Sequence, residues 1–407
     1  MSRPDYRARI KRFNPDLNAF VDLTDDVQGE GLCWGAKSNI AVKGLPLTAG
    51  CEAYRDRIAE RNAKVVSRIQ ASDGTILGTV NMHEGALGAT TDNEAYGRTQ
   101  NPWRRGITPG GSSGGSGAAV AAGLCDVALG TDTMGSVRIP AAYCGVQGHK
   151  PTYGLVPGAG VAPLSTTLDH VGPLARDVAT LWQAMHVLAG WGEAPALKAT
   201  DLAGLRIGLW DGLGSVELTP AVKDGFIFAS AQVEAVGAEL IPMVPPVYDY
   251  SRSRRAGLLV SEVEGAKEHG VTSDGPRPEG LSDVFYSLLH WGVRQSAEKV
   301  QAAYDHIADV HKAAAQVWNE VDFVLVPTAP QEAFRFEDEV PANQADFTAW
   351  ADFARLPATA LFTGLSNDGL PLSCQIIGPE GKDKETLQVA VALETLFGRP
   401  PMPPGFE

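Results

Sequence analysis

The chain has 407 residues, of which 44% are hydrophobic and 20% charged, the profile of an ordinary globular protein rather than a disordered or fibrous one. Lysine and arginine total 34 against 48 acidic residues, a formal net charge of −14. Such a charge repels a phosphate-coated partner, so we do not expect nucleic acid as a ligand. No segment approaches the roughly 20 apolar residues of a membrane span, and the first residues have no apolar stretch typical of a signal peptide, which predicts a cytoplasmic protein with no membrane partner.

Cysteine and histidine usage gives no sign of a disulfide framework or a metal site. The five cysteines are odd in number, widely spaced and without a Cys-x-x-Cys pair, so we expect buried free thiols. The eight histidines lack ligand spacing such as His-Glu-x-x-His. We therefore expect no metal and no organic cofactor.

Short apolar runs alternate with helical patterns, which predicts an α/β sheet covered by helices. Strands are predicted at 74–80, 127–130, 205–210, 239–243, 322–327 and 370–377. Helices are predicted over 176–189, 295–320 and 384–397, with another that opens at Thr219-Pro220, where threonine would cap the first turn, and ends near Gly237. The segment 190–204 is rich in Ala, Gly and Pro and could be a hinge between two lobes.

The most unusual segment, residues 108–117, reads Thr-Pro-Gly-Gly-Ser-Ser-Gly-Gly-Ser-Gly and runs into an alanine-rich stretch predicted to be helical. A flexible linker is one interpretation, but its position between apolar elements argues against it. A phosphate cradle would need Gly-Lys-Ser/Thr at the end of the segment, which is absent. A nucleophile elbow around Ser112, with Asp169 and His170 as partners, would need a preceding strand, and an adjacent Asp-His pair cannot readily place a carboxylate behind its own imidazole. We therefore expect His170 to be structural.

A second serine, Ser136, stands in a better context for nucleophilic chemistry. It follows the predicted strand at 127–129, and Gly135 permits a tight turn on which the backbone N–H groups of 133–136 can converge as an oxyanion hole. Without a convincing histidine, the base would be a lysine kept neutral by burial. Lys37 lies in an unusually apolar setting that suits this role.

As a set, these residues resemble the amidase signature family. The resemblance rests on short motifs that occur in the same order as in that family: 36–40 (Ala-Lys-Ser-Asn-Ile), 77–82 (Leu-Gly-Thr-Val-Asn-Met), 96–103, 109–116, 129–141, 143–145 and 150–154 (Lys-Pro-Thr-Tyr-Gly). Thinner matches follow at 168–176, 327–330 and 375–379. The resemblance implies one domain over 1–407, with a signature core at about 30–180, a variable substrate-shaping region at about 240–300, and a central mixed, twisted β-sheet covered by helices on both faces.

The resemblance also implies a Ser-Ser-Lys triad. Ser136 would be the nucleophile, Ser112 the bridging serine after a cis peptide bond, and Lys37 the base that withdraws the proton through Ser112. The backbone of Thr133, Met134, Gly135 and Ser136 would form the oxyanion hole, with Ser113 and Arg138 in support. Tyr286 and Trp291, in the variable region, are the substrate-binding candidates, and an arginine of that region could bind a substrate carboxylate.

Three positions depart from the family pattern. Met134 stands where the family usually has glycine, and its side chain could narrow the acyl pocket or strain the turn. Ser38 replaces a common aspartate and Thr79 a common lysine, which alters the charges near Lys37.

The leading functional prediction is an amidase that hydrolyses the C–N bond of a small linear amide through a Ser136 acyl-enzyme, with water as the second substrate and a homodimer as one possible assembly. One alternative is the amidase subunit of a glutamine-dependent amidotransferase complex, against which the acidic composition and the short chain argue. The other alternative is a non-catalytic homologue in which Met134 blocks the oxyanion hole.

Overall fold

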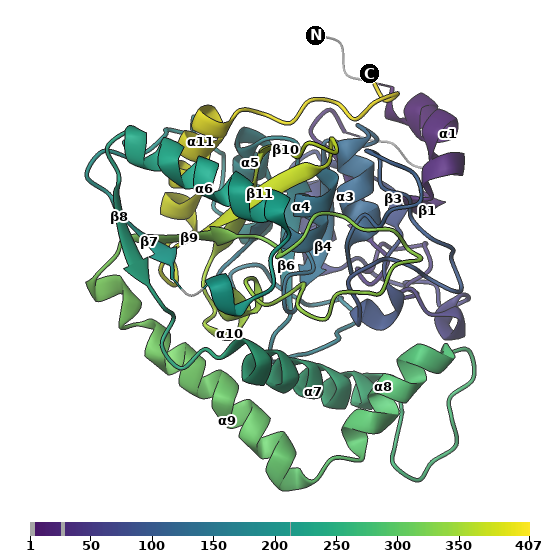
Figure 1. Ribbon diagram of the computed structural model, residues 1–407. Coiled ribbons are helices and arrows are strands. Elements are labelled where there is room, and N and C mark those ends of the chain that lie inside the picture. Colours follow the sequence, from purple (N-terminus) through teal and green to yellow (C-terminus); the bar gives the residue numbers. More distant parts are fainter. Residues whose placement is uncertain (1–4, 26–28, 212) are drawn as a thin grey trace.

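The computed structural model describes residues 5–25, 29–211 and 213–407. Within these residues one mixed sheet of 11 strands runs through the molecule in the order β1-β3-β2-β4-β6-β5-β10-β11-β9-β7-β8 (Figure 1). The strands are β1 Phe20–Leu23, β2 Cys33–Lys37, β3 Thr75–Val80, β4 Val127–Asp132, β5 Gln147–Lys150, β6 His170–Ala175, β7 Arg206–Trp210, β8 Glu239–Met243, β9 Phe323–Pro327, β10 Ala358–Leu365 and β11 Pro371–Ile377. β2 pairs in parallel with β3 and β4, and β7 in parallel with β8 and β9, whereas the strands between these groups pair antiparallel.

The helices are α1 Tyr6–Leu17, α2 Lys64–Ala71, α3 Gly114–Ala121, α4 Arg138–Cys144, α5 Val178–Ala189, α6 Pro220–Ala235, α7 Tyr250–Glu268, α8 Asp283–Val293, α9 Ala297–Ala314, α10 Ala349–Phe353 and α11 Asp383–Phe397. Several begin at side-chain caps: Asp177, Asp249 and Ser296 each accept a hydrogen bond from an amide of the first turn. Pro220 opens α6 as predicted, but the Thr219 side chain forms no capping hydrogen bond with a described residue, so that part of the prediction is wrong.

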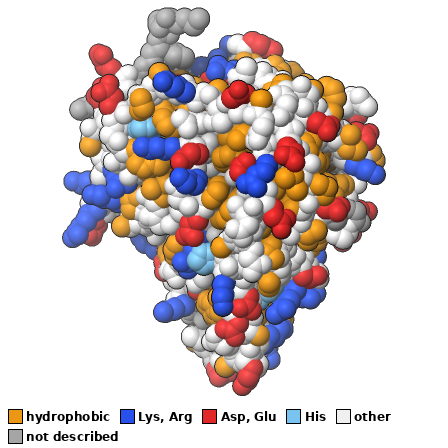
Figure 2. All heavy atoms as spheres, turned by 90° about the vertical axis from the view of Figure 1, so that its left-hand side faces the viewer, with side chains coloured by type: hydrophobic (Ala, Val, Ile, Leu, Met, Phe, Trp, Pro, Cys, Tyr) orange, Lys and Arg blue, Asp and Glu red, His pale blue; other side chains and the backbone are white. Residues whose placement is uncertain are grey.

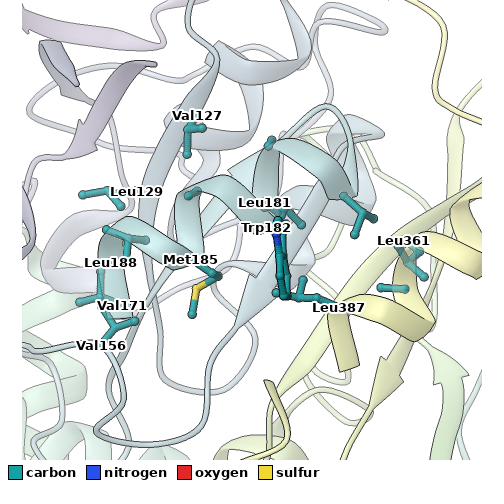
Figure 3. Close-up of a cluster of buried hydrophobic side chains, with 14 of the residues drawn as sticks. Val127, Leu129, Val156, Val171, Leu181, Trp182, Met185, Leu188, Leu361 and Leu387 are labelled. Atoms are coloured by element: carbon teal, nitrogen blue, oxygen red, sulfur yellow. The ribbon is translucent and has the colours of Figure 1, made fainter. Parts of the chain in front are cut away.

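Successive side chains along the central strands point to opposite faces of the sheet, so the hydrophobic core is divided between these two faces. On β4, Val127 and Leu129 pack into one cluster with α2, α5 and α11, while Ala128 packs into another with α1, α3 and α4. Figure 3 shows Val127 and Leu129 beside Leu181, Met185 and Leu188 of α5. A third cluster packs α7, α9 and α10 against β9, on the face of β9 opposite to the first cluster. The prediction of a mixed sheet covered on both faces is confirmed.

The segment 190–204 connects α5 to β7, and both the strands before it and the strands after it belong to the same sheet. Helices α7, α8 and α9 form an arm along the lower edge of the body in Figure 1. Figure 2 shows basic and acidic side chains intermingled on the face it displays. In the part of the chain that the structure describes, no helix combines the length and the apolar character needed to cross a bilayer.

Candidate active site

Lys37 ends β2 and is completely buried between the two neighbouring parallel strands. Its Nζ donates hydrogen bonds to Ser112 Oγ at 2.7 Å and to Thr131 Oγ1 at 2.8 Å. Burial lowers the pKa of Lys37 to about 7, although Asp169 and Asp132 act in the opposite direction. About half of Lys37 is therefore neutral at pH 7 and able to accept a proton, as a general base requires.

The serine-rich segment forms the loop before α3 and the first turn of that helix. The Gly111–Ser112 peptide bond is cis, and the Ser112 carbonyl accepts a hydrogen bond from the His83 amide at 3.0 Å. Ser113 fastens the segment to β4, because its Oγ donates to the Thr131 carbonyl at 3.2 Å and accepts from the Thr131 amide at 3.3 Å. The loop is thus held against the strand whose end leads to Ser136.

Ser136 lies on the turn between β4 and α4. Gly135 in this turn has a φ of 136°, and a Cβ there would approach Thr348 Oγ1 to 2.2 Å, so the position needs glycine. Asp132 Oδ1 accepts the Gly135 amide and Asp132 Oδ2 accepts the Val137 amide. The Gly135 N–H therefore braces the turn, which differs from its predicted role as an oxyanion donor.

Thr133, Met134 and Ser136 present amides that donate to no other described residue, so they remain suited to an oxyanion. The turn is also held from outside, since Thr348 Oγ1 donates to the Met134 carbonyl at 2.5 Å. Thr133 Oγ1 donates to Asp169 Oδ1 at 2.6 Å. The sequence suggests Asp169 only as a partner of His170, so this contact with the turn that carries Ser136 could not be predicted.

Arg138 lies beneath the turn and away from solvent. Its guanidinium donates to both carboxyl oxygens of Asp132, at 3.0 and 3.1 Å, and to Asp352 Oδ2 at 2.6 Å. Although burial opposes it, Arg138 holds the pKa of Asp132 below its usual range. His170 is buried in the same cluster, with Nδ1 3.2 Å from the Asp132 carbonyl, so Arg138 and His170 support the turn and do not line the pocket.

A pocket of about 190 Å³ opens beside Ser136. It is lined by Ala86, Leu87, Gly88, Ala89, Thr133, Met134, Ser136, Ile139, Leu164, Arg254, Leu258, Ser261, Pro341, Ala342, Gln344 and Ala345. Tyr286 and Trp291, the predicted substrate-binding residues, are not among these. Tyr286 stacks on His290 within α8, and the Trp291 ring lies under Lys299 at 4.7 Å.

Met134 fits the turn without backbone strain, because its φ is not positive. Its thioether packs under α7 against Gly257, where an added Cβ would come within 2.7 Å of Met134 Sδ. Met134 thus forms part of the pocket wall and does not fill the pocket. Of the other two departures, Ser38 is buried beside Lys37, and Thr79 donates to Asp22 Oδ2 at 3.0 Å.

The structure places the predicted catalytic residues close to one another, but one hydrogen bond of the expected relay is not formed. Ser113 N donates to the Ser136 carbonyl at 3.3 Å, which joins the two serine loops. The Ser112 hydroxyl is bonded to Lys37 Nζ and forms no hydrogen bond with the Ser136 hydroxyl. Such bonds are often long before substrate binds. In the described part of the chain, no group of three or more His, Cys, Asp or Glu side chains could hold a metal ion, and all five cysteines are buried and free.

A buried lysine bonded to one serine, and a second serine at a pocket beside free amides, define a site suited to acyl transfer by a serine nucleophile. The family model described as Amidase matches residues 30–387, and the chain belongs to the amidase signature family.

The chain is 33% identical to the A subunit of the glutamyl-tRNA(Gln) amidotransferase of Chlamydia abortus, over 96% of this chain and 90% of the relative. The crystal structure of the A subunit of the glutamyl-tRNA(Gln) amidotransferase from Thermotoga maritima is similar, with a TM-score of 0.86, 28% identity and coverage of 98% and 93%. A crystal structure described as an amidase is similar with a TM-score of 0.87, 28% identity and coverage of 97% and 95%. The expected fold and family are thereby confirmed.

Proposed function

We propose that the protein hydrolyses the C–N bond of a small amide through an acyl-enzyme on Ser136. The observation that carries this proposal is the 2.7 Å hydrogen bond from the fully buried Lys37 Nζ to Ser112 Oγ. A lysine in this setting, with its pKa lowered to about 7 by burial, can receive a proton at neutral pH and return it later in the same cycle.

In the first half of the reaction, Ser136 Oγ attacks the amide carbonyl and its proton passes through the Ser112 hydroxyl to Lys37. The new C–O bond leaves an oxyanion that the amides of Thr133, Met134 and Ser136 can stabilise. The C–N bond then breaks, and Lys37 returns the proton through Ser112 to the departing nitrogen, which leaves as ammonia or an amine.

In the second half, water attacks the acyl-enzyme carbonyl while Lys37, again through Ser112, takes one of its protons. The Ser136–carbonyl bond breaks, the proton returns to Ser136, and the carboxylic acid is released. The balance is one amide and one water consumed, with one acid and one ammonia or amine produced, so no co-reactant is needed.

A second candidate is the amidase subunit of a glutamine-dependent amidotransferase. The 33% identity to the Chlamydia protein, over nearly the whole of both chains, favours this candidate more directly than the stand-alone enzyme. A stand-alone amidase and an amidotransferase subunit would use the same Ser136 chemistry. They would differ in whether glutamine is the amide that is hydrolysed and in whether the chain needs a partner protein. The non-catalytic alternative required Met134 to block the site, and a Met134 that packs against Gly257 weakens it.

The deciding experiment is to purify the chain alone and measure ammonia release from glutamine and from simple aliphatic amides, beside the Ser136→Ala variant. Ser136-dependent release from simple amides by the isolated chain, with glutamine left intact, would reject the amidotransferase setting. Release from glutamine only after a partner protein is added would reject the stand-alone setting. Activity that persists in Ser136→Ala would refute both.

A further inference from the structure

The pocket beside Ser136 contains a single charged side chain. Of the described residues that line it, Arg254 alone carries a formal charge, and most of the others are alanine, leucine or similar apolar residues. Arg254 lies on α7 at the spacing that places it on the same helix face as Leu258 and Ser261, which also line the pocket. A lone cation in a small apolar pocket is a strong recognition element.

Arg254 is held in place from behind. One terminal guanidinium nitrogen, Nη1, donates to both oxygens of Asp346 at 3.2 Å, and Asp346 is itself almost fully buried. The other guanidinium nitrogens of Arg254, which form no hydrogen bond with a described residue, can still donate, and a quarter of the side chain, 24%, is exposed. A planar guanidinium fixed on one edge can offer its other edge to a second carboxylate.

The pair keeps some positive charge at neutral pH. Burial raises the pKa of Asp346 to about 7, with Asp249 adding to the effect and Arg254 opposing it. Asp346 is therefore only partly ionised near pH 7, and it does not fully neutralise the guanidinium. No acidic side chain is found among the described residues that line the pocket, so the site offers nothing to balance a substrate ammonium.

We propose that Arg254 is the subsite for a carboxylate on the substrate, so that the preferred amides are monoamides of short dicarboxylic acids without an ammonium group. This inference rests on the proposed Ser136 chemistry and adds the substrate class to it. The pocket volume of about 190 Å³ suits a short acyl group.

The test compares the monoamides of malonic, succinic and glutaric acid with neutral amides in which an isopropyl group, similar in shape, replaces the carboxylate. Binding is measured by calorimetry to Ser136→Ala, which cannot turn the amides over, and the kcat/KM of the unmodified chain is measured in parallel. We expect at least one monoamide to be preferred over its neutral counterpart, and glutaramate to be preferred over glutamine, which adds only the ammonium.

Arg254→Met should reduce the preference of monoamide over neutral amide by about 10- to 150-fold, since hydrogen bonds between charged groups contribute about 1.5 to 3 kcal/mol. The preference is the ratio of the binding constants, or of the kcat/KM values, for the two amides. A smaller fraction of folded enzyme lowers both values equally and leaves this ratio unchanged. Arg255→Met is the matched control, because Arg255 is the next residue on α7 and is exposed, bonded to Ser251, and outside the pocket. It should leave the ratio unchanged.

The inference would be overturned by equal binding of monoamides and neutral amides, by a ratio that Arg254→Met leaves unchanged, or by preference for glutamine over glutaramate. Each leaves the proposed Ser136 chemistry intact, which fails only if hydrolysis persists in Ser136→Ala. The inference would also be overturned if Arg254→Met and Arg255→Met both abolished the preference for monoamides over neutral amides, since the preference would then not depend on a residue of the pocket.

Discussion

The depressed pKa of Lys37 predicts how fast Ser136 reacts as the pH changes. With a pKa of about 7, about one-tenth of Lys37 is neutral at pH 6 and about nine-tenths at pH 8. An exposed lysine, with a pKa near 10.4, would be about 0.04% neutral at pH 7. Because only neutral Lys37 can take the Ser136 proton, reactivity should be high above pH 7 and should fall about tenfold for each pH unit well below it.

The assay is the second-order rate of Ser136 labelling by a fluorophosphonate between pH 5 and pH 10, with the modified residue identified by mass spectrometry. It needs no knowledge of the natural substrate. We expect a rise of about tenfold from pH 6 to pH 8 and a plateau above it. His83, whose pKa burial lowers to about 4, stays neutral over this range, whereas Asp169, with a pKa raised by burial to about 6, makes the lower limb shallower.

Lys37→Met should abolish labelling, and Lys43→Met, at an exposed lysine six residues along the chain, should label like the unmodified protein. A labelling rate that keeps rising to pH 10, or one that is flat from pH 5 to pH 8, would refute the argument from burial. The first result would mean that Lys37 is solvated, and the second that another group activates Ser136.

Three further predictions follow from single contacts. Asp169→Asn should lower the pH at which the labelling rate of Ser136 is half-maximal, because Asp169 is the foremost charge that raises the Lys37 pKa. A shift of this midpoint to higher pH would contradict that role of Asp169. Gly257→Ala should destabilise the fold by about 1 to 3 kcal/mol in a denaturant titration, because the added Cβ would lie 2.7 Å from both Met134 Sδ and Phe353 Cζ. Met134→Ala should relieve only the part of that loss that comes from Met134, and a double variant whose two losses simply add would contradict the contact. Arg138→Met should lower the free energy of unfolding by about 3 to 5 kcal/mol, since it leaves two buried carboxylates without their cation. A change under 1 kcal/mol would refute the argument that Arg138 stabilises the turn.

Local patterns were enough to single out Ser136 and Lys37 as candidates, because Ser136 follows a predicted strand on a glycine-containing turn and Lys37 lies in an apolar run. The bridging role predicted for Ser112 came only from the family resemblance. The long strand and helix patterns after residue 200 were also predicted close to their observed bounds, for example β9 at Phe323–Pro327 and α11 at Asp383–Phe397.

Strand β6 shows why other elements could not be predicted. Its sequence contains Gly172 and Pro173, which disfavour strands. It nevertheless pairs with β4 along its whole length, while β5 pairs only with Leu174 and Ala175. Pro173 therefore has a ladder partner on one side alone, as on an edge strand, and only the assembled sheet reveals this.

The same limit applies to contacts that join distant segments of the site. Thr348 reaches the Met134 carbonyl across 214 residues of sequence, and no local pattern indicates that contact. Arg254 also could not be singled out from its neighbours Arg252 and Arg255, because only the orientation of α7 decides which arginine lines the pocket.

The bracing of the nucleophile turn has a consequence for the order in which the protein matures on the ribosome. Lys37, Ser112 and Ser136 all leave the exit tunnel early, yet Arg138 is bonded to the Thr348 carbonyl, to Asp352 and to Gln375 Oε1. Gln375 is synthesised about 240 residues after Ser136, on the order of 10 to 50 s later at typical elongation rates. A nascent chain with every reactive side chain in place should therefore stay inert until its last strands join the sheet, and a fragment ending before residue 348 should not react with the fluorophosphonate.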